Sequence, residues 1–173
     1  IHHSTMTCSN ARRTVDFYTK ILGLKLVKKT VNYDASETYH IYFGDETGRP
    51  GTLLTFFEWP DAGYGCWGIG TTHHLALTVE TEEAQLKCKR WLTDHNIQIT
   101  GPYNRVYFKS LYFTDPDGLI LEIATRKPGW TIDESPDQLG RNVIHPPDNV
   151  THRGRNEEEI AAITWKEPLA ALT

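Results

Sequence analysis

The chain of 173 residues lacks the features of several specialised protein classes. Its three cysteines, Cys8, Cys66 and Cys88, are odd in number and have no metal-type spacing. This excludes a disulfide-stapled scaffold and favours a reducing compartment. No stretch approaches the roughly 18 apolar residues of a membrane span, and the first residues show no signal-peptide pattern. We therefore expect a cytoplasmic protein with no membrane partner.

The chain also has few positively charged residues relative to negatively charged ones. Lys and Arg number 18 against 22 Asp and Glu, which gives a net charge of -4. Such a balance offers no electrostatic footprint for nucleic acid, so we expect a small-molecule or protein partner. The length suits one domain with a sizeable core, with or without a tail.

The chain contains an internal repeat of about seventy residues, in which a strand, a helix and three further strands follow one another. In the first copy the apolar periodicity predicts a helix over 11–22, and Gly23 is placed to end it. The strands of this copy are expected at 2–8, 25–32, 39–44 and 52–59.

The second copy follows a connection crowded with glycine, at positions 63, 65, 68 and 70. Thr81 is a candidate N-cap, with acidic residues in the first turn of a helix over 82–96. Asp115 to Gly118 reads as a tight turn. The strands are expected at 73–79, 97–100, 106–114 and 119–124.

Each copy begins with a His-His pair, and an apolar strand late in the second copy carries a single carboxylate, Glu122. When the copies are aligned, His3 falls on His74, and Thr55 falls on Glu122. Two imidazoles and one carboxylate form the ligand set of a non-haem Fe(II) facial triad. The sequence therefore predicts a metal site with open coordination positions.

Beyond Lys127 the periodicity fades, and residues 128–173 read as a C-terminal extension with one helix at about 156–163. We expect an α+β fold of two βαβββ modules within one domain over residues 1–127. The first module spans 1–60 and the second 71–127.

The duplicated order and the late Asp-Pro-Asp-Gly turn resemble the vicinal oxygen chelate superfamily, which includes glyoxalases, fosfomycin-resistance enzymes and extradiol dioxygenases. The chain is most similar to the ring-cleaving hydroquinone dioxygenase branch. The matching sequence segments include Asp16-Phe17-Tyr18, Tyr39-His40-Ile41-Tyr42-Phe43 and Asn104-Arg105-Val106-Tyr107-Phe108-Lys109-Ser110-Leu111-Tyr112.

This resemblance implies that the modules fold into one cup-shaped mixed β-sheet with flanking helices. It assigns the metal ligands to the second His of each pair and the late Glu, which are His3, His74 and Glu122. The implied metal is Fe(II), with Mn(II) as the alternative. The other implied active-site groups are His2, Thr5, His73, Arg105 and Tyr112.

The implied activity is ring cleavage of a hydroquinone or catechol-like phenol with O₂. His73 or Tyr112 would accept the phenolic proton, and Arg105 would stabilise an anionic oxygen. Relatives in this branch are generally much longer, with two such domains between which the ligands are divided. Because two subunits could exchange modules to build the same cup, we expect a homodimer.

Three other functions fit the same residues. A glyoxalase-like isomerase usually takes a fourth ligand at the place of Thr55, for which threonine is a poor substitute. A fosfomycin-type thiol transferase also uses two His and one Glu, but no phosphonate-binding cluster is recognisable. A metal-free module that binds an aromatic drug would not need His3, His74 and Glu122 together.

Overall fold

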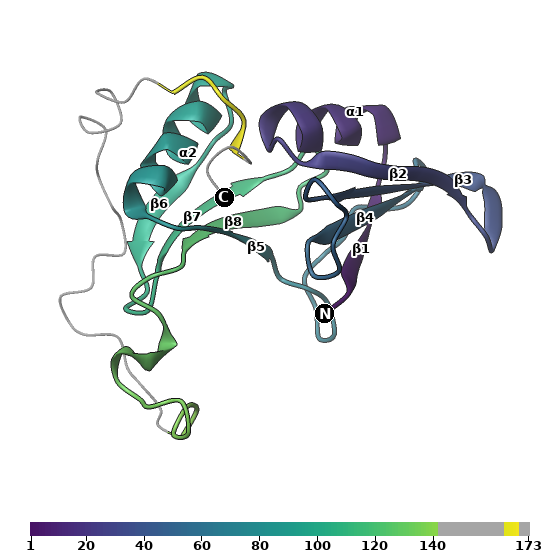
Figure 1. Cartoon of the computed structure of the whole chain (residues 1–173). Coiled ribbons are helices and arrows are strands. Elements are labelled where there is room, and N and C mark those ends of the chain that lie inside the picture. Colours follow the sequence, from purple (N-terminus) through teal and green to yellow (C-terminus); the bar gives the residue numbers. More distant parts are fainter. Residues whose placement is uncertain (142–164, 170–173) are drawn as a thin grey trace. The chain divides into compact units, whose positions relative to one another are not determined.

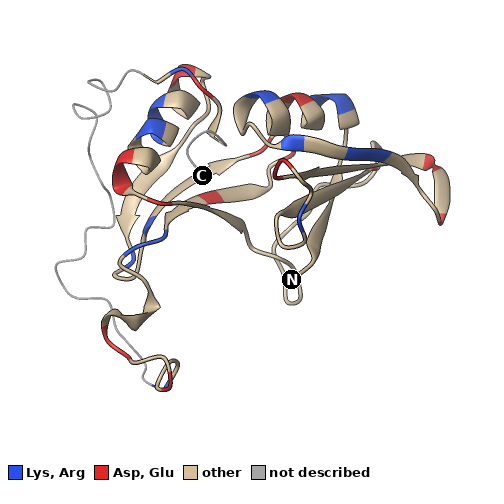
Figure 2. Ribbon diagram, viewed as in Figure 1, with Lys and Arg blue, Asp and Glu red and all other residues tan. Residues whose placement is uncertain are grey.

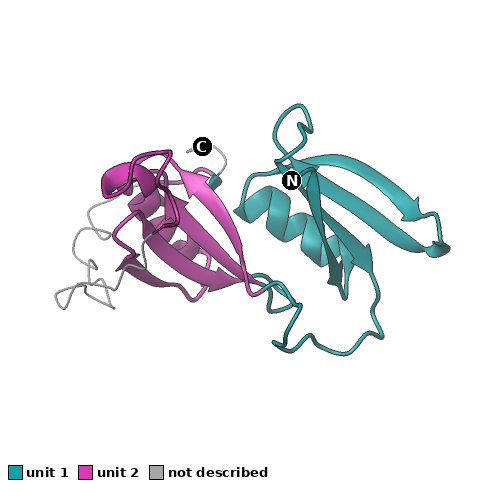
Figure 3. Cartoon of the chain, turned by 90° about the horizontal axis from the view of Figure 1, so that it is seen from below, with its two compact units in different colours: residues 1–72, 115–119, 168–171 teal, residues 73–114, 120–167, 172–173 magenta. Residues whose placement is uncertain are grey.

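The structure is a computed structural model, and it describes residues 1–141 and 165–169 (Figure 1). The chain divides into two compact units (Figure 3). Unit 1 comprises residues 1–72, 115–119 and 168–171, and unit 2 comprises 73–114, 120–167 and 172–173.

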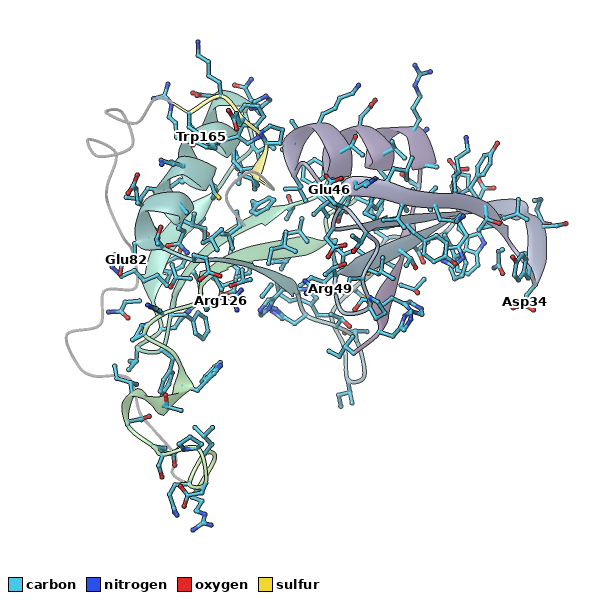
Figure 4. The ribbon with its side chains drawn as sticks, in the orientation of Figure 1. Asp34, Glu46, Arg49, Glu82, Arg126 and Trp165 are labelled. Atoms are coloured by element: carbon cyan, nitrogen blue, oxygen red, sulfur yellow. The ribbon has the colours of Figure 1, made fainter. Side chains whose placement is uncertain are left out.

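Unit 1 contains the first strand-helix-strand order. Its elements are β1 (His3–Cys8), α1 (Ala11–Asp16), the π-helical segment η1 (Phe17–Ile21), β2 (Lys25–Asn32), β3 (Ala35–Gly44) and β4 (Leu53–Glu58). The four strands form one mixed sheet in the order β1-β4-β3-β2. Strand β1 runs parallel to β4, and the other pairs are antiparallel. Figure 4 labels Asp34 at the turn between β2 and β3.

The expected helix over 11–22 forms as α1 followed by η1. Asn10 caps its start, since the Asn10 side chain accepts a hydrogen bond of 2.8 Å from the backbone N–H of Arg13. Gly23 ends it with a φ of 73°, a left-handed conformation that glycine adopts without steric cost. The expectation for Gly23 is confirmed.

An aromatic cluster forms the core of unit 1. The ring of Tyr18 lies 5.1 Å from that of Phe43 and 4.8 Å from that of Phe56, and all three side chains are buried. The Tyr18 hydroxyl donates to the buried carboxylate of Asp115, which lies in the 115–119 turn that belongs to this unit. The polar end of Tyr18 is thereby satisfied within the core.

Unit 2 repeats the order. Its elements are β5 (Leu75–Val79), α2 (Glu82–Asp94), β6 (Thr100–Asn104), β7 (Lys109–Thr114) and β8 (Ile120–Thr125). The strands form a second mixed sheet in the order β5-β8-β7-β6. The Thr81 side chain caps α2 by accepting from the Ala84 N–H, and acidic residues occupy the first turn, as Figure 2 shows and as expected.

Two strands of unit 2 begin three residues later than the sequence predicted. The prediction of a strand at 97–100 is wrong, and the strand lies at Thr100–Asn104. The backbone N–H of Ile97 donates instead to the carbonyl of Leu92 and so ends α2. Asn96 adopts a positive φ of 58° at this closure. The strand expected at 106–114 is shortened to Lys109–Thr114, since Val106 has a φ of 72° and cannot continue a strand.

The turn expected at 115–118 is confirmed. The Asp115 carboxylate accepts hydrogen bonds of 2.9 Å from the backbone N–H groups of Asp117 and Leu119. Gly118 has a φ of 89°, which favours glycine at this position.

The described part of the C-terminal extension contains a short 3₁₀ segment, η2 (Trp130–Ile132). The helix expected at 156–163 lies outside the described residues. In the part of the chain that the structure describes, no helix is both long and apolar enough to cross a membrane. The α+β class and the two βαβββ modules are confirmed, with one four-stranded sheet in each module.

Candidate functional site

Each oxygen of the Glu122 carboxylate has a polar partner within unit 2. Glu122 lies on β8, and its side chain is 4% exposed. One oxygen, Oε2, lies 2.8 Å from Nε2 of His74, and the other accepts a hydrogen bond from the Ser110 hydroxyl on β7. A buried carboxylate needs such partners, since an unpaired one would be costly to desolvate. Both oxygens of Glu122 are therefore fixed in direction.

His73 orients the ring of His74. The two Nδ1 atoms lie 2.9 Å apart, and the rings meet edge to face. One Nδ1 therefore donates to the other, and Nε2 of His74 remains as the atom that faces Glu122. Metal-bound histidines usually have the second ring nitrogen held in this way by a neighbouring group.

Tyr112 and Arg105 lie beside this pair. Tyr112 is the cross-strand partner of Glu122, and the edge of its ring packs against His74 at 5.7 Å between centroids. An Arg105 Nη2 lies 3.4 Å from the Tyr112 hydroxyl, and the guanidinium also covers the Tyr112 ring at 5.6 Å. Unit 2 thus brings an imidazole, a carboxylate, a phenol and a cation together.

The loop that carries Arg105 is held from both sides. The backbone N–H of Arg105 donates to Phe108, and Asn104 Oδ1 accepts from the N–H of Val106 at 2.8 Å. Trp130 of the C-terminal extension stacks on Tyr107, with 5.1 Å between ring centroids. The positive φ of Val106 is unusual for a β-branched residue, so these contacts maintain a strained backbone.

The His pair of unit 1 has the same geometry. Nδ1 of His2 lies 3.0 Å from Nδ1 of His3, and both side chains are exposed at the start of β1. Thr5 follows on the same face of this strand, where its hydroxyl accepts a hydrogen bond of 2.9 Å from Thr55. Thr55 is completely buried.

The strand register confirms that Thr55 occupies in unit 1 the position that Glu122 occupies in unit 2. Thr55 pairs with Thr5 on β1, two residues after His3, and Glu122 pairs with Ala76 on β5, two residues after His74. The position that holds a carboxylate in unit 2 therefore holds a hydroxyl in unit 1.

The expected site residues divide between the units. Five lie together in unit 2, and His2, His3 and Thr5 lie together in unit 1. Of the three expected metal ligands, His74 and Glu122 are adjacent, while His3 belongs to the other unit. Within residues 1–141 and 165–169 no three His, Cys, Asp or Glu side chains are grouped as they would be around an ion.

Three polar residues at these sites were not predicted from the sequence: Ser110, His40 and Tyr42. Ser110 lies two residues before Tyr112 on the same face of β7, which was the available signal. Within unit 1, His40 bonds to Thr55 and Tyr42. Burial, and to a smaller extent the nearby His3, lowers the pKa of His40 below its usual 6.5.

Residues 1–123 match the model of a protein family described as the "Glyoxalase/Bleomycin resistance protein/Dioxygenase superfamily". The chain belongs to this superfamily. The match covers both modules up to β8 and so includes every expected site residue of the chain, from His2 to Glu122.

Among relatives in this superfamily, the chain is 41% identical over 141 residues to "Putative ring-cleaving dioxygenase MhqO" of Bacillus subtilis, covering 78% of this chain and 44% of that protein. It is 38% identical over 130 residues to "Chlorohydroquinone/hydroquinone 1,2-dioxygenase" of Sphingobium indicum, covering 71% and 39%. The crystal structure of a "putative dioxygenase" from Bacillus subtilis superposes with a TM-score of 0.68 at 40% identity, covering 73% of this chain and 40% of that one. The chain thus spans less than half the length of these relatives.

Proposed function

We propose that the protein is an Fe(II)-dependent, extradiol-type ring-cleaving dioxygenase that acts on a hydroquinone or catechol-like phenol with O₂. The observation that carries the proposal is the buried Glu122 carboxylate, 2.8 Å from Nε2 of His74. The similarity to a ring-cleaving dioxygenase and to a hydroquinone 1,2-dioxygenase supports ring cleavage and a hydroquinone as substrate.

His74, Glu122 and His3 would hold the metal. The donor set fits, because Nε2 of His74 and Oε2 of Glu122 lie 2.8 Å apart, a separation that two ligands of one ion can have. His3 offers Nε2, for which no partner is found among the described residues, while its Nδ1 is engaged by His2. Held by these two imidazoles and one carboxylate, Fe(II) would supply the redox chemistry through which O₂ oxidises the phenol. Mn(II) would fit the same donors.

The neighbours of the pair would manage protons and charge. The Tyr112 hydroxyl or the His73 ring would accept the proton of the phenol, and both lie next to His74. Arg105 would stabilise the resulting anionic oxygen, since its guanidinium already lies at the Tyr112 hydroxyl. Ser110 would hold the Glu122 carboxylate in its orientation.

We also propose a homodimer. Two subunits that exchange modules would build the same cup from equivalent strands. Light scattering coupled to gel filtration would give the mass in solution, and a monomer with full activity would contradict this assembly.

The test of the activity is iron-dependent O₂ consumption with a panel of hydroquinones and catechols. Protein loaded anaerobically with Fe(II) should consume O₂ on addition of one of these phenols and form a ring-opened, coloured semialdehyde. Glu122→Gln should abolish both metal retention and O₂ uptake, whereas Glu83→Gln, an exposed change on α2, should leave them unchanged. Full iron occupancy without O₂ uptake across the panel would refute the proposed function.

A further inference from the structure

Unit 1 contains three residues that correspond in position to Glu122, Ser110 and Tyr112 of unit 2, but two of the three differ in type. Tyr42 is the cross-strand partner of Thr55, as Tyr112 is of Glu122. His40 precedes Tyr42 by two residues and bonds to Thr55, as Ser110 precedes Tyr112 and bonds to Glu122. The first module therefore keeps the arrangement of the second but replaces its carboxylate with a hydroxyl.

These groups form a continuous chain of hydrogen bonds. The Tyr42 hydroxyl lies 2.8 Å from Nδ1 of His40, and Nε2 of His40 lies 3.0 Å from the Thr55 hydroxyl. Thr55 lies 2.9 Å from the Thr5 hydroxyl. The chain begins at the half-buried Tyr42, passes through the fully buried Thr55 and ends at the exposed Thr5, on the face of β1 that carries His3. It therefore connects the interior of unit 1 with the neighbourhood of an expected metal ligand.

Such a chain has only two directions. A neutral imidazole has one donor and one acceptor nitrogen, so the direction of one His40 bond fixes that of the other. When Thr55 receives from Nε2, its single hydrogen is left to donate to Thr5. In one direction Tyr42 donates to His40, His40 donates to Thr55, and Thr55 donates to Thr5. In the other direction the Thr5 hydrogen is used up on Thr55.

The chemistry of the groups favours the first direction. Burial raises the pKa of Tyr42 above its ordinary 10, but the phenol is still more acidic than the threonine hydroxyls, and imidazole is its best acceptor. Burial lowers the pKa of His40, which keeps the ring neutral as either direction requires. Thr5 then receives a hydrogen from Thr55, and its own hydrogen has no acceptor among the described residues.

We propose that the Tyr42–His40–Thr55 chain directs the Thr5 hydroxyl to donate its hydrogen to an anionic oxygen of the phenolic substrate, on the His3 face of β1. His40, Tyr42 and Thr55 are positioning residues that act through Thr5. The substrate role rests on the proposed ring-cleaving function, whereas the direction of the chain does not. A phenolate oxygen matches this arrangement, because it accepts hydrogen bonds and has none to donate.

The direction of the chain is measured by the tautomer of His40. In ¹⁵N-labelled, metal-free protein, long-range nitrogen–proton correlation spectra separate the Nε2–H from the Nδ1–H form. The protein has eight histidines, and the signals that disappear in the His40→Gln variant identify those of the His40 ring. We expect Nε2–H at neutral pH. The Nδ1–H form would overturn the proposal, since Thr5 would then donate to Thr55.

Action through Thr5 is measured by a double-mutant cycle in Fe(II)-loaded protein. Tyr42→Phe should raise the KM for hydroquinone about threefold to tenfold, the value of one hydrogen bond, with a smaller effect on kcat. In a Thr5→Val background the same change should have no effect. Thr55→Val should behave like Tyr42→Phe, and Thr55→Ser should restore the wild-type KM, since serine keeps the hydroxyl.

The matched control is Tyr39→Phe, which changes an exposed tyrosine of the same strand and should leave the KM unchanged. Additive effects of Tyr42→Phe and Thr5→Val would overturn the positioning role. Wild-type protein that turns over no phenol would overturn the substrate role together with the proposed function. The Nε2–H tautomer would still establish the direction of the chain in that case, so the two failures are distinguishable.

Discussion

Oε2 of Glu122 lies 2.8 Å from Nε2 of His74, and the Glu122 side chain is 4% exposed. A carboxylate at this depth in a β-sheet is a costly placement, and here it is compensated by His74 on one oxygen and Ser110 on the other. The two atoms that face one another are also the two that would bind a divalent metal. The pair therefore links the fold of unit 2 to its proposed chemistry.

Ser110→Ala should weaken metal binding without abolishing it. The substitution removes the hydrogen bond that orients the second oxygen of Glu122, and the loss of such a supporting partner typically costs about 10-fold to 100-fold in metal affinity. Titration with Mn(II), followed by calorimetry, measures the change. Thr78→Ala on β5 is the control for a hydroxyl lost from an exposed strand position, and equal affinities for both variants would contradict the role of Ser110.

Metal should stabilise the fold through Glu122. A ligand that binds only the native state at about 100 times its dissociation constant adds about 2.7 kcal/mol to the free energy of unfolding. Urea denaturation with and without Mn(II) should show a gain of this order for the wild type and none for Glu122→Gln. A gain that survives in Glu122→Gln would place the bound metal elsewhere.

Tyr18→Phe should raise the pKa of Asp115. Burial already raises this pKa above 3.8, while hydrogen bonds from the backbone and from the Tyr18 hydroxyl lower it. Removing the hydroxyl, which lies 3.1 Å from Asp115 Oδ2, takes away one group that stabilises the carboxylate. Carbon-detected NMR of the Asp115 carboxyl group measures the shift.

The same change has a predictable pH dependence. Because the folded pKa of Asp115 is raised, its contribution to stability is complete below pH 3.8 and is lost as the pH rises through the folded value. The Tyr18 hydroxyl mainly stabilises the charged form, so Tyr18→Phe should cost little in acid and about 1–3 kcal/mol at neutral pH. Tyr33→Phe, at a side chain that is 92% exposed, is the control. A pH-independent loss would contradict this coupling.

Val106→Gly should give a more stable protein than Val106→Ala. Both changes remove the Val106 side chain, but at a φ of 72° only glycine avoids the clash of Cβ with the backbone. The difference in the free energy of unfolding should be about 1 kcal/mol. Equal stabilities would show that the loop carrying Arg105 does not keep its left-handed residue in solution.

The repeat in the sequence predicted the most important structural equivalence. Aligning the two copies of the repeat placed Thr55 on Glu122. The strand pairings confirm this equivalence, because each of the two residues pairs with the residue two positions after the second His of its module. The strands around Ile97 and Val106 were misplaced. Their boundaries depend on a helix closure and a positive φ, and neither produces an apolar period in the sequence.

The supporting residues could not be predicted in the same way. Ser110 and His40 each bond to a residue diagonally across the neighbouring strand. Which of several polar side chains makes such a contact depends on rotamers and on local twist, which the order of residues does not determine. The roles of the expected ligands His3, His74 and Glu122 stay predictions that the experiments above address.

The fate of labelled oxygen tests the central proposal most directly. Fe(II)-loaded protein should be supplied with hydroquinone under ¹⁸O₂, the ring-opened product reduced at once with borohydride to prevent exchange with water, and its mass measured. A ring-cleaving dioxygenase predicts a product that contains both labelled oxygen atoms, formed with one O₂ consumed for each ring opened. A product without label, or the oxidation of hydroquinone to benzoquinone with its ring intact, would contradict it.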